Sequence, residues 1–133
     1  MTALAADRNT PYQDAELIAV PMAAATTIYA GSLVAANASG YAVPGSTATT
    51  LTALGRAEEQ AVNAGSAGDK TVLVRRGKAF QFANDGSDPV VQGDLGKSCY
   101  ITDDQTVSHT STGKSVAGQV MGLDSAGVWV WID

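Results

Sequence analysis

Apolar residues are densest between residues 115 and 133, and their spacing predicts two strands. The first strand covers Val116 and residues 119–123, and the second covers residues 128–132. Between them lies the sequence Asp124-Ser125-Ala126-Gly127. Aspartate at the first position of a type I turn accepts hydrogen bonds from the backbone that follows it, and glycine at the fourth position adopts the left-handed conformation of a bulged hairpin. This segment therefore predicts a tight antiparallel hairpin.

The second strand of this hairpin is apolar on both faces. Because side chains alternate along a strand, Trp129 and Trp131 share one face, and Val128, Val130 and Ile132 share the other. We expect both faces to be covered, one by the core and the other by either the core or a partner subunit. Trp129 and Trp131 are therefore candidates for an oligomer interface.

Shorter apolar runs, separated by turn residues, predict further strands along the rest of the chain. They lie at residues 16–20, 28–29, 32–36, 41–43, 70–75, 79–82, 97–102 and 106–110. Pro21 ends the first run, and Gly77 interrupts another, as expected at a bulge or a sharp bend. About eight to ten strands at this spacing are typical of a small antiparallel β-barrel or sandwich, which is the all-β fold we predict.

Two segments carry competing or helical signals. In residues 51–62 the Ala, Leu, Glu and Gln content favours a helix, but Gly55 and the preceding Thr-rich sequence favour a strand, which is our prediction. Asp88 followed by Pro89 reads as a helix N-cap and first helical residue. We expect one short helix over residues 89–95, with Gly93 limiting its length and Gly96 ending it.

Residues 1–14 have no strand or helix periodicity and contain Pro11. One interpretation is a frayed terminus. The other is an extended N-terminal arm that becomes ordered on a neighbour, with Leu4 and Tyr12 as apolar anchors and Asp7, Arg8 and Asn9 as polar contacts. Residues 15–133 are expected to form a single β-barrel domain.

The composition argues against nucleic acid and membrane partners. The 133 residues carry a net charge of −5, and only Arg75, Arg76 and Lys78 cluster, which we interpret as solvated strand positions. No apolar stretch reaches the ~18 residues of a membrane span, and the N-terminus lacks a signal-peptide core, so a soluble and initially cytoplasmic product is expected. The single cysteine, Cys99, reads as a small buried hydrophobic residue.

No catalytic or metal-binding pattern stands out. His109 is the only histidine, and without a G-x-S-x-G elbow it reads as an exposed residue at a strand end. The pair Asp103-Asp104 suits a turn and Glu58-Glu59 a solvated edge, because adjacent strand residues point to opposite faces. The small residues of the surface favour packing against other proteins. We therefore expect an assembly component without enzymatic activity, cofactor or metal.

Several segments of the chain resemble the capsid cement, or head decoration, proteins of tailed bacteriophages and prophages. They are DRNTPYQDAEL (7–17), YAGSLVAANASGYAVPG (29–45), GRAEEQAVNAGSAGDKTVLVRRGKAFQFAN (55–84), GKSCYITDDQTVS (96–108) and SVAGQVMGLDSAGVWVWI (115–132). The resemblance consists of glycine turns and strand residues and contains no catalytic signature.

This resemblance implies a structural virion protein that binds the outside of the expanded head and clamps adjacent major capsid subunits. It also implies a β-barrel body, a strand-adding N-terminal arm, and self-association as a dimer or trimer on the capsid surface after assembly in the host cytoplasm. An alternative from another class is a receptor- or carbohydrate-binding β-barrel module of a phage tail or spike. A third, a small hydrolase, would need a pocket around His109.

Overall fold

The computed structural model describes residues 2–133 and shows an all-β protein, as the strand pattern predicts. These residues contain more strands than the eight to ten expected, because several are only three residues long. The elements are β1 (Leu17–Pro21), β2 (Thr26–Ile28), β3 (Leu33–Ala36), β4 (Ala42–Pro44), β5 (Thr52–Ala57), β6 (Ala61–Asn63), β7 (Thr71–Arg75), β8 (Lys78–Asn84), the 3₁₀ turn η1 (Gln92–Asp94), β9 (Ser98–Ile101), β10 (Thr106–Ser108), β11 (Val116–Asp124) and β12 (Gly127–Ile132).

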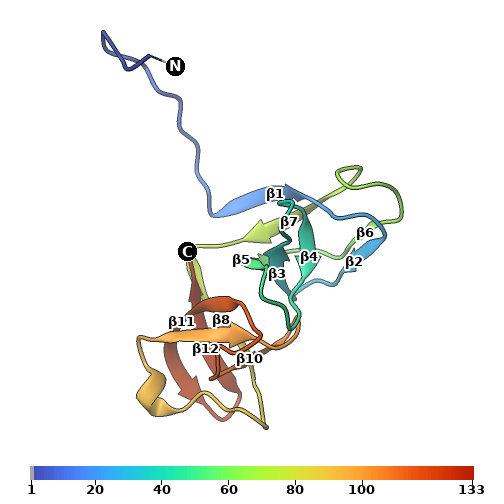
Figure 1. The fold of residues 1–133 in the computed structure, drawn as a ribbon, viewed down its shortest axis with the longest axis vertical. Helices are drawn as coiled ribbons and strands as arrows, with labels where there is room; N and C mark the ends of the chain where they lie inside the picture. Colours follow the sequence, from blue (N-terminus) through green and yellow to red (C-terminus); the bar gives the residue numbers. More distant parts are fainter. Residues whose placement is uncertain (1) are drawn as a thin grey trace.

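The strands form an open sheet and a closed barrel (Figure 1). The sheet has the order β1-β7-β5-β3-β4, and β2 pairs with β6 beside it. The barrel contains the five strands β10-β8-β12-β11-β9 and so occupies residues 78–132, a smaller part of the chain than the expected 15–133. Four of its pairings are antiparallel. The short contact between β8 and β10 is parallel, with Ala83 opposite Thr106.

The chain passes from the sheet to the barrel at Gly77, where the sequence predicts a bend. Gly77 has a φ of +70°, which favours glycine. Its N–H donates to the carbonyl oxygen of Ile132 at 2.7 Å, and this bond joins the bend to the last barrel strand. The predicted bend is therefore the junction between the two parts of the fold.

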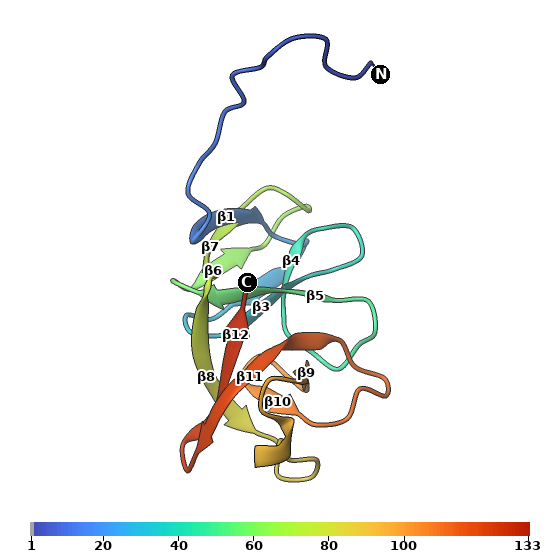
Figure 2. The same ribbon diagram turned by 90° about the vertical axis from the view of Figure 1, so that its left-hand side faces the viewer.

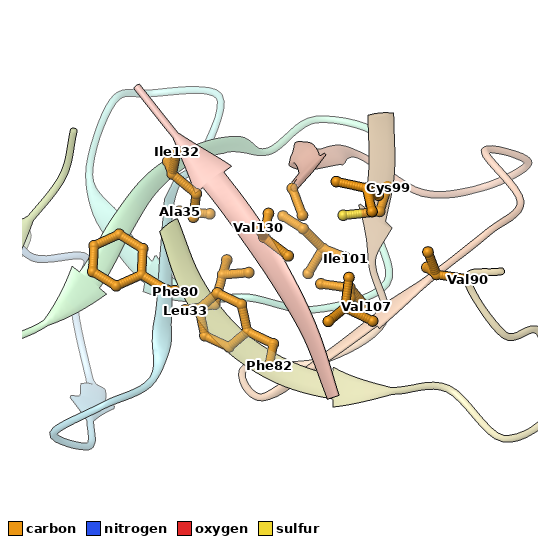
Figure 3. Close-up of a cluster of buried hydrophobic side chains, with 13 residues drawn as sticks. Leu33, Ala35, Phe80, Phe82, Val90, Cys99, Ile101, Val107, Val130 and Ile132 are labelled. Carbon is orange, nitrogen blue, oxygen red and sulfur yellow. The ribbon is translucent and has the colours of Figure 1, made fainter. Parts of the chain in front are cut away.

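Two buried cores lie on either side of β3. Leu33 and Ala35 point into the barrel core, which Figure 3 shows together with Phe80, Phe82 and Val130. Val34, between them in the sequence, belongs to the core of the sheet. Because side chains alternate along a strand, β3 contributes to both cores and couples them.

Residues 51–62 contain strand and no helix, as predicted, but a bend at residues 58 and 59 divides the expected single strand into two. They form β5 and β6, and Gly55 has a φ of +153° beside a register shift between β3 and β5. A Cβ atom at Gly55 would lie 2.1 Å from the carbonyl oxygen of Arg75, so only glycine fits there. The predicted hairpin at residues 124–127 forms, and β3 and β4 form another: the side-chain oxygens of Asp124 and Asn37 accept backbone N–H groups of their own turns.

The expected helix over residues 89–95 is wrong except for its last turn, η1. Asn84 holds Val90 in an extended conformation by accepting its N–H at 2.8 Å and donating to its carbonyl oxygen at 2.9 Å. The carboxylate of Asp88, expected to cap the helix, instead accepts the backbone N–H and the hydroxyl of Thr110. Across residues 2–133 no helix is long and apolar enough to span a bilayer.

Candidate functional site

The N-terminal arm, residues 2–15, is an irregular extended segment that projects away from the body (Figures 1 and 2). Met1, the first residue of the expected arm, lies outside the described residues. All six predicted contact residues are exposed: Leu4, Asp7, Arg8, Asn9, Pro11 and Tyr12. The apolar anchors are 74% exposed at Leu4 and 99% exposed at Tyr12. The arm thus presents apolar side chains that its own body does not cover.

The root of the arm is attached to the junction between sheet and barrel. The backbone N–H of Arg76 donates to the carbonyl oxygen of Glu16 at 2.8 Å, and Lys78 Nζ lies 3.9 Å from the Glu16 carboxylate. Within the arm, Arg8 and Thr10 form both a backbone and a side-chain hydrogen bond. These contacts hold the arm at Glu16 and leave residues 2–15 accessible to solvent.

Trp129 and Trp131 lie on the outer face of the barrel, while Val128, Val130 and Ile132 point into the core, as the alternation predicts. The indoles are 40% and 37% exposed, and Met121 on β11 is 52% exposed. Residues 2–133 therefore cover this face only in part. We call Met121, Trp129 and Trp131 the tryptophan face.

Hydrogen bonds hold one end of the tryptophan face. Trp129 Nε1 and Gln81 Nε2 both donate to the Asp124 carboxylate, at 3.3 and 2.9 Å. The N–H of Ala126, together with these donors and the N–H of Gly127, lowers the pKa of Asp124. The carboxylate thus stays ionised and orients the Trp129 ring along the barrel surface.

Substitution of Trp129 by alanine is expected to lower the free energy of unfolding by only about 1 kcal/mol, because the ring is already partly in water. The matched control is Phe82→Ala in the adjacent strand, which removes a buried aromatic ring and should cost ~3–5 kcal/mol. Urea unfolding of both variants tests this difference. An equal loss of unfolding free energy in the two variants would mean that the Trp129 ring is in the core, which would contradict its position on the outer face of the barrel.

Two of the basic residues near Gly77, Arg75 and Arg76, have hydrogen-bond acceptors in the same chain, whereas Lys78 is exposed, as its interpretation as a solvated position predicts. Arg75 Nε lies 2.8 Å from Glu58, and Arg76 Nη2 donates to the carbonyl oxygen of Asp133 at 2.7 Å. Arg56 also pairs with Glu58, which is therefore a bridge between β5 and β7 and not a free edge residue. Hydrogen bonds from Arg75 and then Arg56 lower the pKa of Glu58. Of the three basic residues, only Arg75 is therefore held by a close carboxylate.

His109 is half-exposed at the end of β10, as expected, but it has a partner that the sequence does not reveal. Its Nδ1 lies 2.8 Å from Oδ2 of Asp94, a buried residue of η1. The neighbouring Ser108 hydroxyl accepts a hydrogen bond from Lys114 and contacts the Tyr100 carbonyl, not the His109 ring. In the described part of the chain, His109 and Asp94 therefore tie η1 to β10 without a hydroxyl nucleophile beside them.

The Asp94 carboxylate should make stability depend on pH below about 4. The backbone N–H of Val91, and then the His109 ring, lower the pKa of Asp94 in the folded protein. A lowered folded-state pKa contributes stability above the unfolded value of about 3.9, and this contribution is lost as the pH falls. Asp94→Asn should therefore be less stable than the parent at pH 7, with the difference narrowing towards pH 2. Urea midpoints at pH 7, 4 and 2 measure this, and a constant difference would contradict it.

Two hollows lie between the sheet part and the barrel part. The first, which we call the groove, has a volume of about 450 Å³ and is lined by residues 49, 51–53, 114–117, 132 and 133. The second, which we call the cleft, has about 370 Å³ and is lined by residues 29–32, 104 and 105. Tyr29, at the cleft, is 60% exposed. Sequence reasoning missed both hollows, because each joins loops or strand ends that are far apart in the chain.

Cys99 is fully buried in the barrel core, which confirms the prediction of a small hydrophobic role. Burial raises the pKa of its thiol to about 12, so it is not a reactive thiolate near neutral pH. Among residues 2–133 there is no group of three or more His, Cys, Asp or Glu side chains placed to hold a metal ion.

These features define an all-β protein with a closed five-stranded barrel, an appended sheet and several exposed apolar side chains. No family model, curated protein or solved structure matches the chain. The arm, the tryptophan face and the two hollows are separate surfaces, so the structure does not gather the predicted contact residues into one site.

Proposed function

We propose that the protein is a non-enzymatic capsid cement protein. It decorates the outer surface of the expanded head of a tailed phage and clamps adjacent major capsid subunits. The observation that carries this proposal is the exposed arm, residues 2–15, which presents Leu4 and Tyr12 to the solvent. The resemblance of the sequence to head decoration proteins supports it.

The arm suits attachment to a neighbouring protein surface. An exposed extended segment can add main-chain hydrogen bonds to a sheet edge, and its alternate side chains can enter pockets there. Ordering this segment costs conformational entropy, so the affinity of a single copy is modest. Many copies in symmetric positions still give large total stabilisation, because linked contacts raise the effective concentration.

Preference for the expanded shell follows from differential affinity. A protein shifts a conformational equilibrium only by binding one state better than the other. In this proposal the edges that receive the arm exist only after expansion, so attachment stabilises the expanded head. On the shell, where neighbouring copies are already held close together, self-association through the tryptophan face, as a dimer or trimer, adds contacts between copies.

The charge distribution is compatible with a position outside the shell. The net charge is −5, and Arg75 and Arg76 are occupied by acceptors of the same chain. Binding to packaged DNA would require free cationic groups that neutralise phosphates. The proposal therefore includes no nucleic acid, membrane, cofactor or metal. It places the protein in the host cytoplasm only during assembly.

Co-sedimentation with heads of the matched phage, assembled without this protein, tests the proposal. Unexpanded and expanded heads are compared at increasing protein concentration. Saturable binding to expanded heads alone is the expected result. Absence of binding to either form would overturn the proposal.

A second candidate function is a receptor- or carbohydrate-binding module of a tail or spike, and the cleft favours it. The exposed Tyr29 ring lies at a hollow that Asp104 and Gln105 also line. Sugar sites commonly combine an aromatic surface with a few polar groups that fix orientation. If the head-binding experiment fails, this function becomes the first choice.

A further inference from the structure

We propose that the groove receives the N-terminal arm of a second copy of this chain. The groove lies between the start of β5 on the sheet side and the start of β11 and the end of β12 on the barrel side. Its volume of about 450 Å³ is within the usual range of binding pockets. The proposal concerns the free protein in the absence of any shell, so it goes beyond capsid attachment and is tested separately.

The groove is bordered by two strand ends that each lack a partner on one side. Thr52 and Ala53 pair with β3, whereas β7 reaches β5 only at Arg56 and Ala57. Across the groove, Val116 pairs with β9, whereas β12 begins to pair with β11 only at Gln119. Strand ends that are open on one side offer main-chain hydrogen-bonding groups to an extended segment. The groove therefore suits a peptide in extended conformation.

The arm matches the groove in shape, apolar content and charge. It is already extended and would give up few internal contacts on docking. The groove lining includes the apolar residues Leu51 and Val116, which are not fully buried, and Leu4 of the arm is an exposed apolar side chain that can cover them. The charged residues of the groove lining are Lys114, which already pairs with Asp88, and Asp133. Arg8 is the only cation in residues 2–15 and is the partner we assign to Asp133.

A second copy, and not the same chain, is the source of the arm. The root at Glu16 is bonded to Arg76, and from there the arm points away from its own body (Figures 1 and 2). Fully extended, residues 2–15 span up to roughly 45 Å, enough to reach another molecule. Reciprocal exchange of arms closes a two-fold dimer, and head-to-tail exchange closes a ring.

Sedimentation velocity of the full chain over a wide concentration range, up to millimolar, tests the proposal. We expect concentration-dependent association that is lost when residues 2–14 are deleted. Arg8→Glu and Asp133→Lys should each weaken association roughly fivefold, and the double variant should restore it, because the swapped charges attract again. Asp14→Lys, a charge change near the root, is the matched control and should leave association unchanged.

Three results would overturn the proposal. The first is a full-length protein that stays monomeric at every concentration. The second is association that survives deletion of the arm but is lost in Trp131→Ala, which would assign the contact to the tryptophan face. The third is protection of the Arg8–Asn9 bond from trypsin that does not change with protein concentration, which would mean that the arm docks on its own chain.

Discussion

Leu33→Ala is expected to lower the free energy of unfolding by about 3–4 kcal/mol and to destabilise sheet and barrel together. Leu33 belongs to a strand of the sheet, but its fully buried side chain is part of the barrel core. Truncation of such a residue removes buried methyl groups and leaves a cavity. Because β3 contributes to both cores, the loss of stability should affect the sheet and the barrel together.

Urea unfolding followed by two probes measures this effect. Fluorescence of Trp129 and Trp131 reports on the barrel, and far-ultraviolet circular dichroism reports on all strands. The two curves should coincide in the parent and in the variant, as for a two-state domain. Leu17→Ala is the control, because Leu17 is 43% exposed on the edge strand β1 and should cost less than about 1 kcal/mol. Separate transitions for the two probes would mean that sheet and barrel unfold independently.

Local chemistry explains why much of the fold could be predicted. Asn37 and Asp124 fold back onto their own turn N–H groups, so each hairpin depends on residues within four positions. The bend at Gly77 depends on one glycine with positive φ. The division of β12 into a face with Trp129 and Trp131 and a face with Val128, Val130 and Ile132 follows from alternation alone, whereas alternation does not indicate which of two apolar faces lies outside.

The division into a sheet and a barrel could not be predicted in the same way. Alternation indicates which face of a strand is buried but not which strand lies beside it. Barrel closure depends on the parallel contact of Ala83 with Thr106, two residues on strands that do not follow one another in the sequence. The double role of β3 likewise depends on where distant strands pack.

Side chains with distant partners account for the wrong or missing predictions. Asp88 has the sequence context of a helix cap, but Thr110 supplies its hydrogen-bond donors. The Asp94 carboxylate contacts the His109 ring because η1 lies beside the residue that follows β10. Tyr29 and Asp104 line the same cleft because two loops lie close together. The pattern of apolar and polar residues in the sequence does not indicate any of these pairs. The exposure of residues 2–15, in contrast, could be predicted, because a segment without periodicity and with a proline is not suited to join the core.

Deletion of residues 2–14 is expected to abolish attachment to expanded heads while the body remains folded. The deleted residues are exposed and lie outside both cores, so the free energy of unfolding should change by less than about 0.5 kcal/mol. Attachment should fail because the apolar anchors Leu4 and Tyr12 are removed together. Co-sedimentation with expanded heads measures attachment, and urea unfolding measures stability.

A variant with the same arm composition in scrambled order separates a specific contact from a mere tether. It keeps the length and charge of the arm but moves Leu4 and Tyr12 out of register, so it should attach as poorly as the deletion. Rescue by the scrambled arm would mean that length alone matters. Full attachment by the truncated protein would refute the role of the arm, and the contact would then have to come from the body. In that case the tryptophan face would be the strongest remaining surface, because it presents Met121, Trp129 and Trp131 together on the outside of the barrel.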